Sequence, residues 1–292
     1  MTFAISKLAL FGVGLIGGSV ALALKQAGVV GEVVGVGRSV TNLQQALKLG
    51  VIDRIASDAV DAVLGADIVL LAVPVGQMAA IMQAIAPHLA ADTVVTDAGS
   101  TKQDVVTMMQ HYLGKQLSHC VPAHPIAGAE LSGAVAARAD LYQSKNLILT
   151  PLADTHPDAL ARVTALWQTC GAKITAMQAM EHDAIFAAVS HLPHLLAYTL
   201  VDMLAQRENA DQLFGLAASG FRDFTRIAGS SPEMWRDIAI ANQAALLVEI
   251  DAYQAKLQQL RAALVDSDSA ALNVIFSRAQ HARQAWATRI AS

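Results

Sequence analysis

The sequence predicts an α/β domain with a doubly wound parallel sheet, followed by an all-helical domain. Up to about residue 177, short apolar runs alternate with helix-like stretches of ten or so residues, which is the pattern of βαβ units. After residue 178 the strand-like runs stop and long helical patterns replace them. A length of 292 residues also fits two domains, which we place at 1–177 and 178–292.

The composition limits the class of protein. Hydrophobic residues make up 54% of the chain and charged residues 15%, which excludes intrinsic disorder. A net charge of -4 gives no basic footprint for nucleic acid. Two cysteines, Cys120 and Cys170, are too few for a disulfide framework or a four-thiolate metal site, and we interpret both as buried thiols in a reducing compartment.

The expected strands are apolar runs without polar alternation, as in strands covered on both faces. They are Lys7–Phe11, Glu32–Val36, Asp67–Val73, Thr93–Thr96 and Asn146–Thr150, with weaker candidates at Leu117–Val121 and Lys173–Ala176. The expected helices between them are Gly17–Ala27, Thr41–Lys48, Gly76–Ile85, Thr101–Leu113, Gly128–Arg138 and Pro157–Thr169. The second domain should contain Glu181–Gln206, kinked at Pro193, then Pro232–Leu264 and Ser267–Ile290.

The apolar run Leu8–Leu24 could suggest a secretory signal or a membrane span. It is shorter than the ~20 residues that a span needs. Its glycines also make it a poor apolar helix. We therefore expect a cytoplasmic protein with no membrane segment.

The glycines of this run form a G-x-G-x-x-G motif in Gly12-Val13-Gly14-Leu15-Ile16-Gly17, after an expected strand and at the start of an expected helix. In that context the first glycine permits a tight turn, the second lets a pyrophosphate approach, and the third allows close helix–strand packing. The free N–H groups at the helix start favour phosphate. The motif predicts a dinucleotide site, which Val73 and Pro74, at the end of the strand Asp67–Val73, should help to form.

The end of the second strand bears on which cofactor binds. An acidic residue there would hold the ribose 2′-hydroxyl of NAD, but no Asp or Glu occurs between Val33 and Ile52. Arg38 and Ser39 stand where a 2′-phosphate would sit. We favour NADP with NAD use possible; the alternative is that Arg38 is only a solvent-exposed arginine in a turn.

Two polar clusters follow later strands, at the edge of the sheet where ligands bind in open α/β folds. The first is Asp97–Lys102 and the second is His124–Gly128. A neutral imidazole can accept the proton of an alcohol while hydride leaves the same carbon, and a serine hydroxyl can orient both groups. We predict that Ser100 and His124 meet above the nicotinamide.

Five segments in order give the chain a specific resemblance. They are Gly12–Ser19 (GVGLIGGS), Asp97–Lys102 (DAGSTK), His124–Gly133 (HPIAGAELSG), Ser190–His194 (SHLPH) and Gly220–Trp235 (GFRDFTRIAGSSPEMW). Together they resemble the prephenate/arogenate dehydrogenase family of tyrosine biosynthesis. The resemblance implies a Rossmann domain of six or more strands and a helical dimerisation domain.

The resemblance also assigns roles to single residues. It implies that His124 is the catalytic histidine with Ser100 as its partner, and that Arg226 binds a substrate carboxylate, for which a guanidinium fork is well suited. Ser190, His191, His194 and Trp235 would line the substrate pocket, with Glu130, Asp183 and Asp223 in less certain polar positions near its entrance. A structural role remains open for Arg226 as an exposed loop residue and for Trp235 as a core residue. Since His191 and His194 have no third ligand at a suitable spacing, we expect no metal.

The implied reaction is the oxidative decarboxylation of prephenate, arogenate or both, with hydride transfer to NAD(P)+. Two alternatives remain. One is another Rossmann-plus-helical dehydrogenase, of the β-hydroxyacid dehydrogenase or imine reductase type, for which Lys102 could act in catalysis. The other is an NADP-binding sensor without turnover. The extensive apolar helices of the second domain also suggest a homodimer, which a monomeric mass in light scattering at micromolar concentration would refute.

Overall fold

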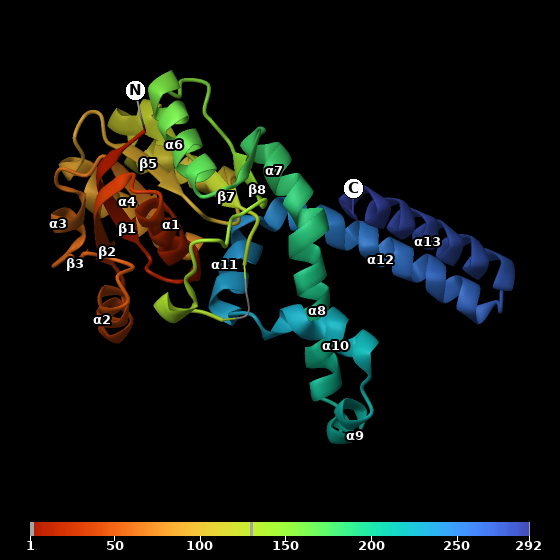
Figure 1. The fold of residues 1–292 in the computed structure, drawn as a ribbon. Coiled ribbons are helices and arrows are strands. Elements are labelled where there is room, and N and C mark those ends of the chain that lie inside the picture. The colour runs from red at the N-terminus through yellow and green to blue at the C-terminus, as the bar shows by residue number, and fades with distance from the viewer. Residues whose placement is uncertain (1–2, 129–130, 292) are drawn as a thin grey trace. The chain divides into compact units, whose positions relative to one another are not determined.

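The computed structural model describes residues 3–128 and 131–291, apart from the side chains of residues 290 and 291. The chain packs as two units, residues 1–243 and 244–292, and each is described by itself (Figure 1). The division expected at residues 177 and 178 follows the change of sequence pattern rather than packing, and it remains a prediction.

The first unit is built on a parallel sheet of six strands in the order β3-β2-β1-β4-β5-β6. The strands are β1 (Ile5–Phe11), β2 (Val30–Val36), β3 (Arg54–Ile55), β4 (Ile68–Leu71), β5 (Val94–Asp97) and β6 (Cys120–Val121). This order reverses direction between β1 and β4, and in open α/β sheets such a switch point is where dinucleotides bind. The predicted fold class is therefore confirmed.

Helices cover both faces of this sheet. They are α1 (Leu15–Gln26), α2 (Val40–Lys48), α3 (Ala59–Val63), α4 (Val75–Ile85), α5 (Gln103–Tyr112) and α6 (Pro157–Thr169). Alternate strand residues point into two separate cores: Leu8 and Leu10 pack with α1 and α6, whereas Ala9 and Phe11 pack with α3, α4 and α5 (Figure 1). Burial on both faces explains why the strands read as continuous apolar runs.

A second sheet of three strands follows, in the order β7-β8-β9. It contains β7 (Ala123–Pro125), β8 (Asn146–Leu149) and β9 (Lys173–Ala176), with β7 antiparallel to β8 and β8 parallel to β9. Its importance lies in β7, which was not expected from the sequence and which carries His124.

The remaining helices of the first unit are α7 (Ala179–Phe186), α8 (Leu192–Ala205), α9 (Ala210–Gly215), α10 (Ser219–Thr225) and α11 (Pro232–Ala241). A π-helical turn, Ala187–His191, joins α7 to α8. Pro193 is the second residue of α8, so it lacks the N–H that would continue the regular ladder, and the wide turn lies directly before it. A π turn therefore lies where the sequence predicted a kink, and such turns are found frequently at functional sites.

Three expected elements were wrong. In place of a helix over Gly128–Arg138, the described residues contain only a 3-10 turn at Ala134–Ala136, because side chains from α1 and α2 take the backbone N–H groups of Ala134 and Arg138. Leu117–Val121 is a strand only at its last two residues, after a 3-10 turn over Gly114–His119. The expected helix Pro232–Leu264 breaks at Asn242, whose side chain is bonded elsewhere.

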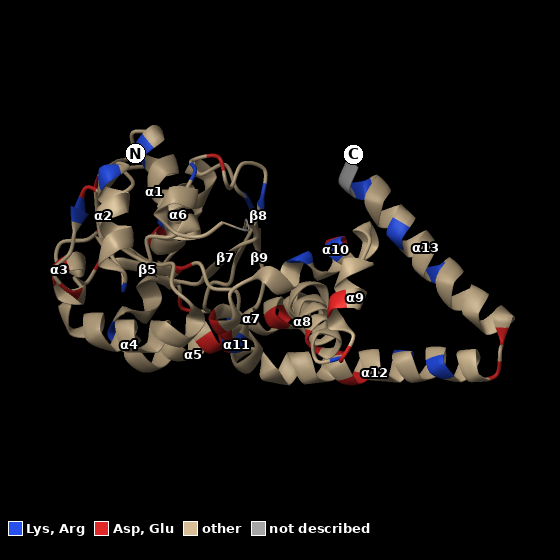
Figure 2. Ribbon diagram, turned by 90° about the horizontal axis from the view of Figure 1, so that it is seen from below, with Lys and Arg blue, Asp and Glu red and all other residues tan. Residues whose placement is uncertain are grey.

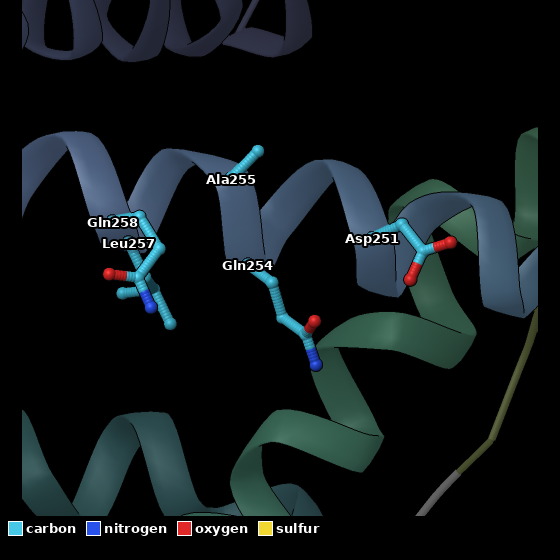
Figure 3. A pocket seen from close by; sticks show the side chains of 5 residues that line it. All are labelled: Asp251, Gln254, Ala255, Leu257 and Gln258. Carbon is cyan, nitrogen blue, oxygen red and sulfur yellow. The ribbon is translucent and has the colours of Figure 1, made fainter.

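The second unit is a helical hairpin, formed by nearly all of α12 (Gln243–Val265) and by α13 (Ser269–Ala291). Asp268 accepts a hydrogen bond from the Ala271 N–H at the start of α13 (2.9 Å). Large apolar side chains remain exposed on both helices, at Leu247, Val248, Leu257, Leu264, Val265, Val274, Phe276 and Trp286. Charged residues are sparse along these helices (Figure 2). A hollow of about 430 Å³ is lined by residues of α12 alone, which are Asp251, Gln254, Ala255, Leu257 and Gln258 (Figure 3).

One helical run, Ala179–Ala205, is long and apolar enough to cross a membrane by length and composition alone, with a mean hydropathy of 1.5. The same run contains the polar residues His182, Asp183 and His191, all buried inside the first unit. Core helices of globular proteins meet the same length and hydropathy criteria, so the run is weak support for a membrane segment.

Candidate active site

The glycine motif forms the turn from β1 into α1. Gly12 has a φ of +94°, and a Cβ at this position would overlap the carbonyl oxygen of Ala72 in the chain after β4. A Cβ at Gly17 would overlap the carbonyl oxygen of Gly12, so this glycine allows α1 to pack against the turn. At Gly14, which precedes α1, a Cβ would meet nothing within 4 Å. The three glycines thus meet the three requirements of a dinucleotide turn.

The other residues of the predicted cofactor site surround this turn. The carbonyl of Val13 accepts a hydrogen bond from Asn42 (2.7 Å), and the carbonyl of Ile16 accepts one from the Tyr142 hydroxyl (2.6 Å). Leu15 begins α1. Val73 lies beside Gly12, and Pro74 immediately precedes α4. The open space above Gly14 and the start of α1, which no side chain of the described residues caps, fit a nicotinamide dinucleotide.

Arg38 and Ser39 follow β2 as expected, but both have partners. The Arg38 guanidinium forms a two-pronged pair with Glu233 at the start of α11, with N–O distances of 3.1 and 3.3 Å. The Ser39 hydroxyl accepts a hydrogen bond from the Asn42 N–H (3.2 Å) and caps α2. Neither role depends on a nucleotide.

A buried ion pair fixes the strand that carries His124. The Lys102 ammonium is fully buried, pairs with Asp97 at the end of β5, and donates to the carbonyl of Ala123 (2.8 Å). The other oxygen of Asp97 accepts the Ala123 N–H (2.9 Å). Both main-chain groups of the residue before His124 are therefore held, and Lys102 acts as a positioning residue.

His124 belongs to a chain of three polar side chains. Its Nδ1 lies 2.8 Å from Nε2 of His182, and Nδ1 of His182 lies 2.7 Å from Asp183 on the same helix, α7. Asp183 also accepts the N–H groups of Lys102 and Gln103 (2.8 and 2.9 Å), so it caps α5 as well. Phe186 covers the His124 and His182 rings.

The protons of this chain can be assigned from its bonding. A carboxylate only accepts, so Nδ1 of His182 donates to Asp183 and its Nε2 accepts from Nδ1 of His124. Nε2 of His124 is then left with its lone pair. Burial raises the pKa of Asp183, but hydrogen bonds, that of His182 first, lower it to a net value below the ordinary range. Asp183 is therefore ionised and orients both rings.

The charge state of His124 follows from its surroundings. Burial lowers its pKa well below the ordinary value of 6.5, and the nearby His182, Lys102 and His191 lower it further. The pKa of His182 is also lowered, mainly by burial. His124 is thus neutral at physiological pH, and its Nε2 is able to accept a proton.

We expect the acid limb of kcat/KM to lie below pH 6.5. A base works in its neutral form, and a lowered pKa extends that form to more acidic pH, so activity should persist as the pH falls through 6.5. Initial rates at low substrate concentration, measured from about pH 4.5 to about pH 8, give kcat/KM. This constant reports the ionisation of groups in the free enzyme. An acid limb at or above pH 6.5 would contradict the assignment.

Ser100 does not bond to His124: among the described residues, the ring of His124 bonds to His182 instead. The backbone of Ser100 lies beside His191, which is buried and accepts a hydrogen bond from Asn242 at Nδ1 (3.0 Å). The same Asn242 amide donates to the carbonyl of Asp183 (2.8 Å). Burial lowers the pKa of His191 to about 4. Asn242 thus ties the end of α11 to α7 and to the π turn.

The remaining predicted substrate residues form a second group next to His191. His194 donates from Nδ1 to the carbonyl of Ser190 (2.8 Å) and stacks on Trp235, with ring centroids 3.7 Å apart. Burial lowers the pKa of His194, and the nearby positive charge of Arg226 lowers it further. The buried indole N–H of Trp235 has no partner within the part of the chain that the structure describes. These residues therefore lie together.

Two further predicted residues remain. Glu130 falls outside the described residues. Asp223 on α10 is exposed, and among the described residues its charged partner is its neighbour Arg222, at 3.8 Å. Reasoning from sequence missed His182 and Asn242. The adjacent His182-Asp183 pair, at the start of the helical run that later carries Ser190–His194, was the available signal.

The site as a whole contains a dinucleotide turn, a neutral buried histidine and a cationic side chain close to an imidazole. Across the described residues, no cluster of three or more His, Cys, Asp or Glu residues could hold a metal ion. The fold and the site define an NAD(P)-dependent oxidoreductase with a helical C-terminal part.

Comparison with known proteins identifies the family. A model described as the prephenate dehydrogenase nucleotide-binding domain matches residues 20–176, and one described as the prephenate dehydrogenase dimerization domain matches residues 178–278. The cyclohexadienyl dehydrogenase of Zymomonas mobilis is 38% identical over 285 residues, which cover 96% of each chain. The chain belongs to the prephenate dehydrogenase family, as the resemblance of its motifs predicted.

Solved structures agree with this result. The prephenate dehydrogenase of Aquifex aeolicus, in complex with hydroxyphenyl propionate and NAD+, is 33% identical, with a TM-score of 0.90 and coverage of 97% of this chain and 99% of that one. The arogenate dehydrogenase of Synechocystis is 28% identical, with a TM-score of 0.79 and coverage of 96% and 99%. These relatives support the predicted dehydrogenase activity and not the two alternatives.

Proposed function

We propose that this enzyme catalyses the oxidative decarboxylation of prephenate, arogenate or both, giving 4-hydroxyphenylpyruvate or tyrosine. The observation that carries the proposal is the neutral His124, which is oriented by His182 and Asp183 and keeps Nε2 available as a base. Family membership and the names of the relatives supply the substrate class.

The residues would divide the reaction as follows. Nε2 of His124 takes the proton of the ring 4-hydroxyl as the carbonyl forms at that carbon. Bound NAD(P)+ supplies the acceptor for the hydride that leaves the same carbon. The C–CO2 bond at the opposite carbon of the same ring then breaks, and its electron pair makes the ring aromatic, which drives the reaction forward. The proton held by His124 returns to the ring oxygen, which becomes the phenol hydroxyl. The protein contributes mainly orientation and charge placement.

We propose that Arg226 binds a substrate carboxylate. It begins a 3-10 turn, Arg226–Gly229, and its charge acts on the His194 ring. His194, Ser190, His191 and Trp235 would form the neighbouring wall. Ser100 would complete the site from the sheet side, where its backbone lies beside His191.

The substitution Arg226→Ala should chiefly raise KM. A carboxylate anchor acts in the ground state and the transition state alike, so kcat should change less than KM. Steady-state kinetics at saturating cofactor measure both constants, with Arg222→Ala, an exposed arginine on α10, as the matched control. An unchanged KM in Arg226→Ala would show that another group holds the carboxylate.

We propose that NADP+ is the preferred cofactor, with NAD+ also used. The support is the absence of an acidic residue from Val33 to Ile52 and the position of Arg38 after β2. The relative from Aquifex aeolicus was crystallised with NAD+. Arg38 is paired with Glu233, so a 2′-phosphate bound there would share the guanidinium with a carboxylate.

We also propose a cytoplasmic homodimer formed through the helical part of the chain. The matching dimerization-domain model and the exposed apolar residues of α12 and α13 support the dimer. The buried thiols of Cys120 and Cys170, whose pKa values burial raises to about 12, fit a reducing compartment.

A direct test combines each substrate with each cofactor. Purified protein is mixed with prephenate or arogenate and with NADP+ or NAD+, and the absorbance of reduced nicotinamide is followed. We expect turnover in at least one combination, and the four rates then rank substrates and cofactors. No turnover in any combination, with cofactor still bound, would overturn the proposed function.

A further inference from the structure

The loop after β2 is joined to the start of α11 by charge. Both outer nitrogens of Arg38 contact the two carboxylate oxygens of Glu233, at 3.1 and 3.3 Å. This is the same planar, two-pronged geometry in which an arginine holds a phosphate. Arg38 and Glu233 are 195 residues apart in the chain, so the pair joins two separate elements of the first unit.

The surroundings of this pair are acidic on the α11 side. Gln77 of α4 lies within hydrogen-bond reach of Glu233 (3.4 Å), and α11 packs against α4. Asp237, one turn further along α11, lies so close to Gly76 that a Cβ there would contact its carboxylate. The Arg38 guanidinium therefore faces carboxylates from α11 rather than open solvent alone.

We propose that Glu233 is a specificity-determining residue that limits the preference for NADP+ over NAD+. A 2′-phosphate seated on Arg38 must displace the Glu233 carboxylate or lie next to it, and like charges at that distance repel. NAD+ has only a hydroxyl at this position and does not compete for the guanidinium. Glu233 thus weakens the binding of NADP+ and leaves that of NAD+ nearly unchanged. This inference rests on the proposed role of Arg38 in the cofactor site.

The expected change in NADP+ affinity follows from the solvent exposure of the Arg38–Glu233 pair. The side chains of Arg38 and Glu233 are 70% and 43% exposed, so solvent screens the pair. Ion pairs on the surface contribute modestly to free energies. Glu233→Gln removes the competition for the Arg38 guanidinium and also the repulsion between Glu233 and the 2′-phosphate, so the two effects add. We expect Glu233→Gln to lower the Kd for NADP+ roughly three- to tenfold and to change the Kd for NAD+ less than twofold.

The test measures the Kd of NADP+ and of NAD+ by titration calorimetry without substrate. The proteins are the parent, Glu233→Gln and, as a control, Asp211→Asn, which removes an exposed carboxylate on α9. Asp211→Asn should leave both constants unchanged. The gain in NADP+ affinity should shrink at 1 M salt, where the screening length is only ~3 Å. In an Arg38→Ala background it should be smaller, since no guanidinium remains to be competed for.

Two outcomes would overturn the inference. An equal change for both nucleotides would mean that Glu233 affects the site in general. A weaker affinity for NADP+ in Glu233→Gln would mean that Glu233 holds Arg38 in place for the phosphate. Failure of the proposed dehydrogenase function would appear instead as a lack of turnover in the parent protein, which this binding measurement does not use.

Discussion

Replacing His124 by asparagine should lower kcat by roughly 10²–10⁴-fold, the usual contribution of a positioned acid–base group. Asparagine keeps a polar side chain of similar size but has no lone pair basic enough to take the hydroxyl proton. The Kd of NAD(P)+ should stay unchanged, because no hydrogen bond among the described residues joins the dinucleotide turn of Gly12–Gly17 to β7. Steady-state kinetics and cofactor titration measure the two effects separately.

The matched control for this variant is His88→Asn, which changes an exposed histidine outside the site. It should retain the parent kcat. A His124→Asn protein with kcat within about threefold of the parent would remove His124 from the mechanism, since such a factor is far below the effect of losing a general base. A loss of cofactor affinity in the same protein would show instead that the substitution disturbs the fold.

The second large effect is expected at Gly14. The substitution Gly14→Val should abolish cofactor binding while the protein still folds. A Cβ at Gly14 meets nothing within 4 Å, and its φ of -111° is accessible to any residue, so the apo fold tolerates a side chain. The added atoms would enter the space that a pyrophosphate needs. A loss of only about 3 kcal/mol of binding free energy raises the Kd of the cofactor roughly 100-fold.

Gly114→Val provides a control, because a Cβ at Gly114 also meets nothing within 4 Å but lies away from the turn. Both variants should unfold at a temperature close to that of the parent. Only Gly14→Val should lose the nucleotide in calorimetric titration. Retention of parent affinity by Gly14→Val would place the pyrophosphate elsewhere.

The elements that depend on local pattern could be predicted from the sequence. The apolar runs of β1, β4 and β5 are buried on both faces, and the glycine turn after β1 has the geometry that its spacing indicates. Family motifs also led to His124, His194, Trp235 and Arg226. His194 stacks on Trp235, and Arg226 lies close enough to lower the pKa of His194.

The parts that could not be predicted depend on tertiary hydrogen bonds. His182 lies 2.8 Å from His124 because β7 carries His124 to it. β7 in turn is paired with β8, and Asp97 and Lys102 hold the main chain of Ala123. The break between α11 and α12 at Asn242 follows from its bonds to Asp183 and His191, which helical periodicity cannot reveal. The Glu233 partner of Arg38 is likewise distant in sequence.

In the proposed reaction this site removes a hydride and CO2 from one substrate, and the hydroxyl proton that His124 takes up returns to the product. The most direct measurement follows CO2 release and reduced-nicotinamide formation together in one reaction, started with prephenate or arogenate. We expect the two products to appear in equal amounts and at equal rates. Reduced nicotinamide without CO2 would indicate a simple alcohol dehydrogenase and would overturn the proposed reaction.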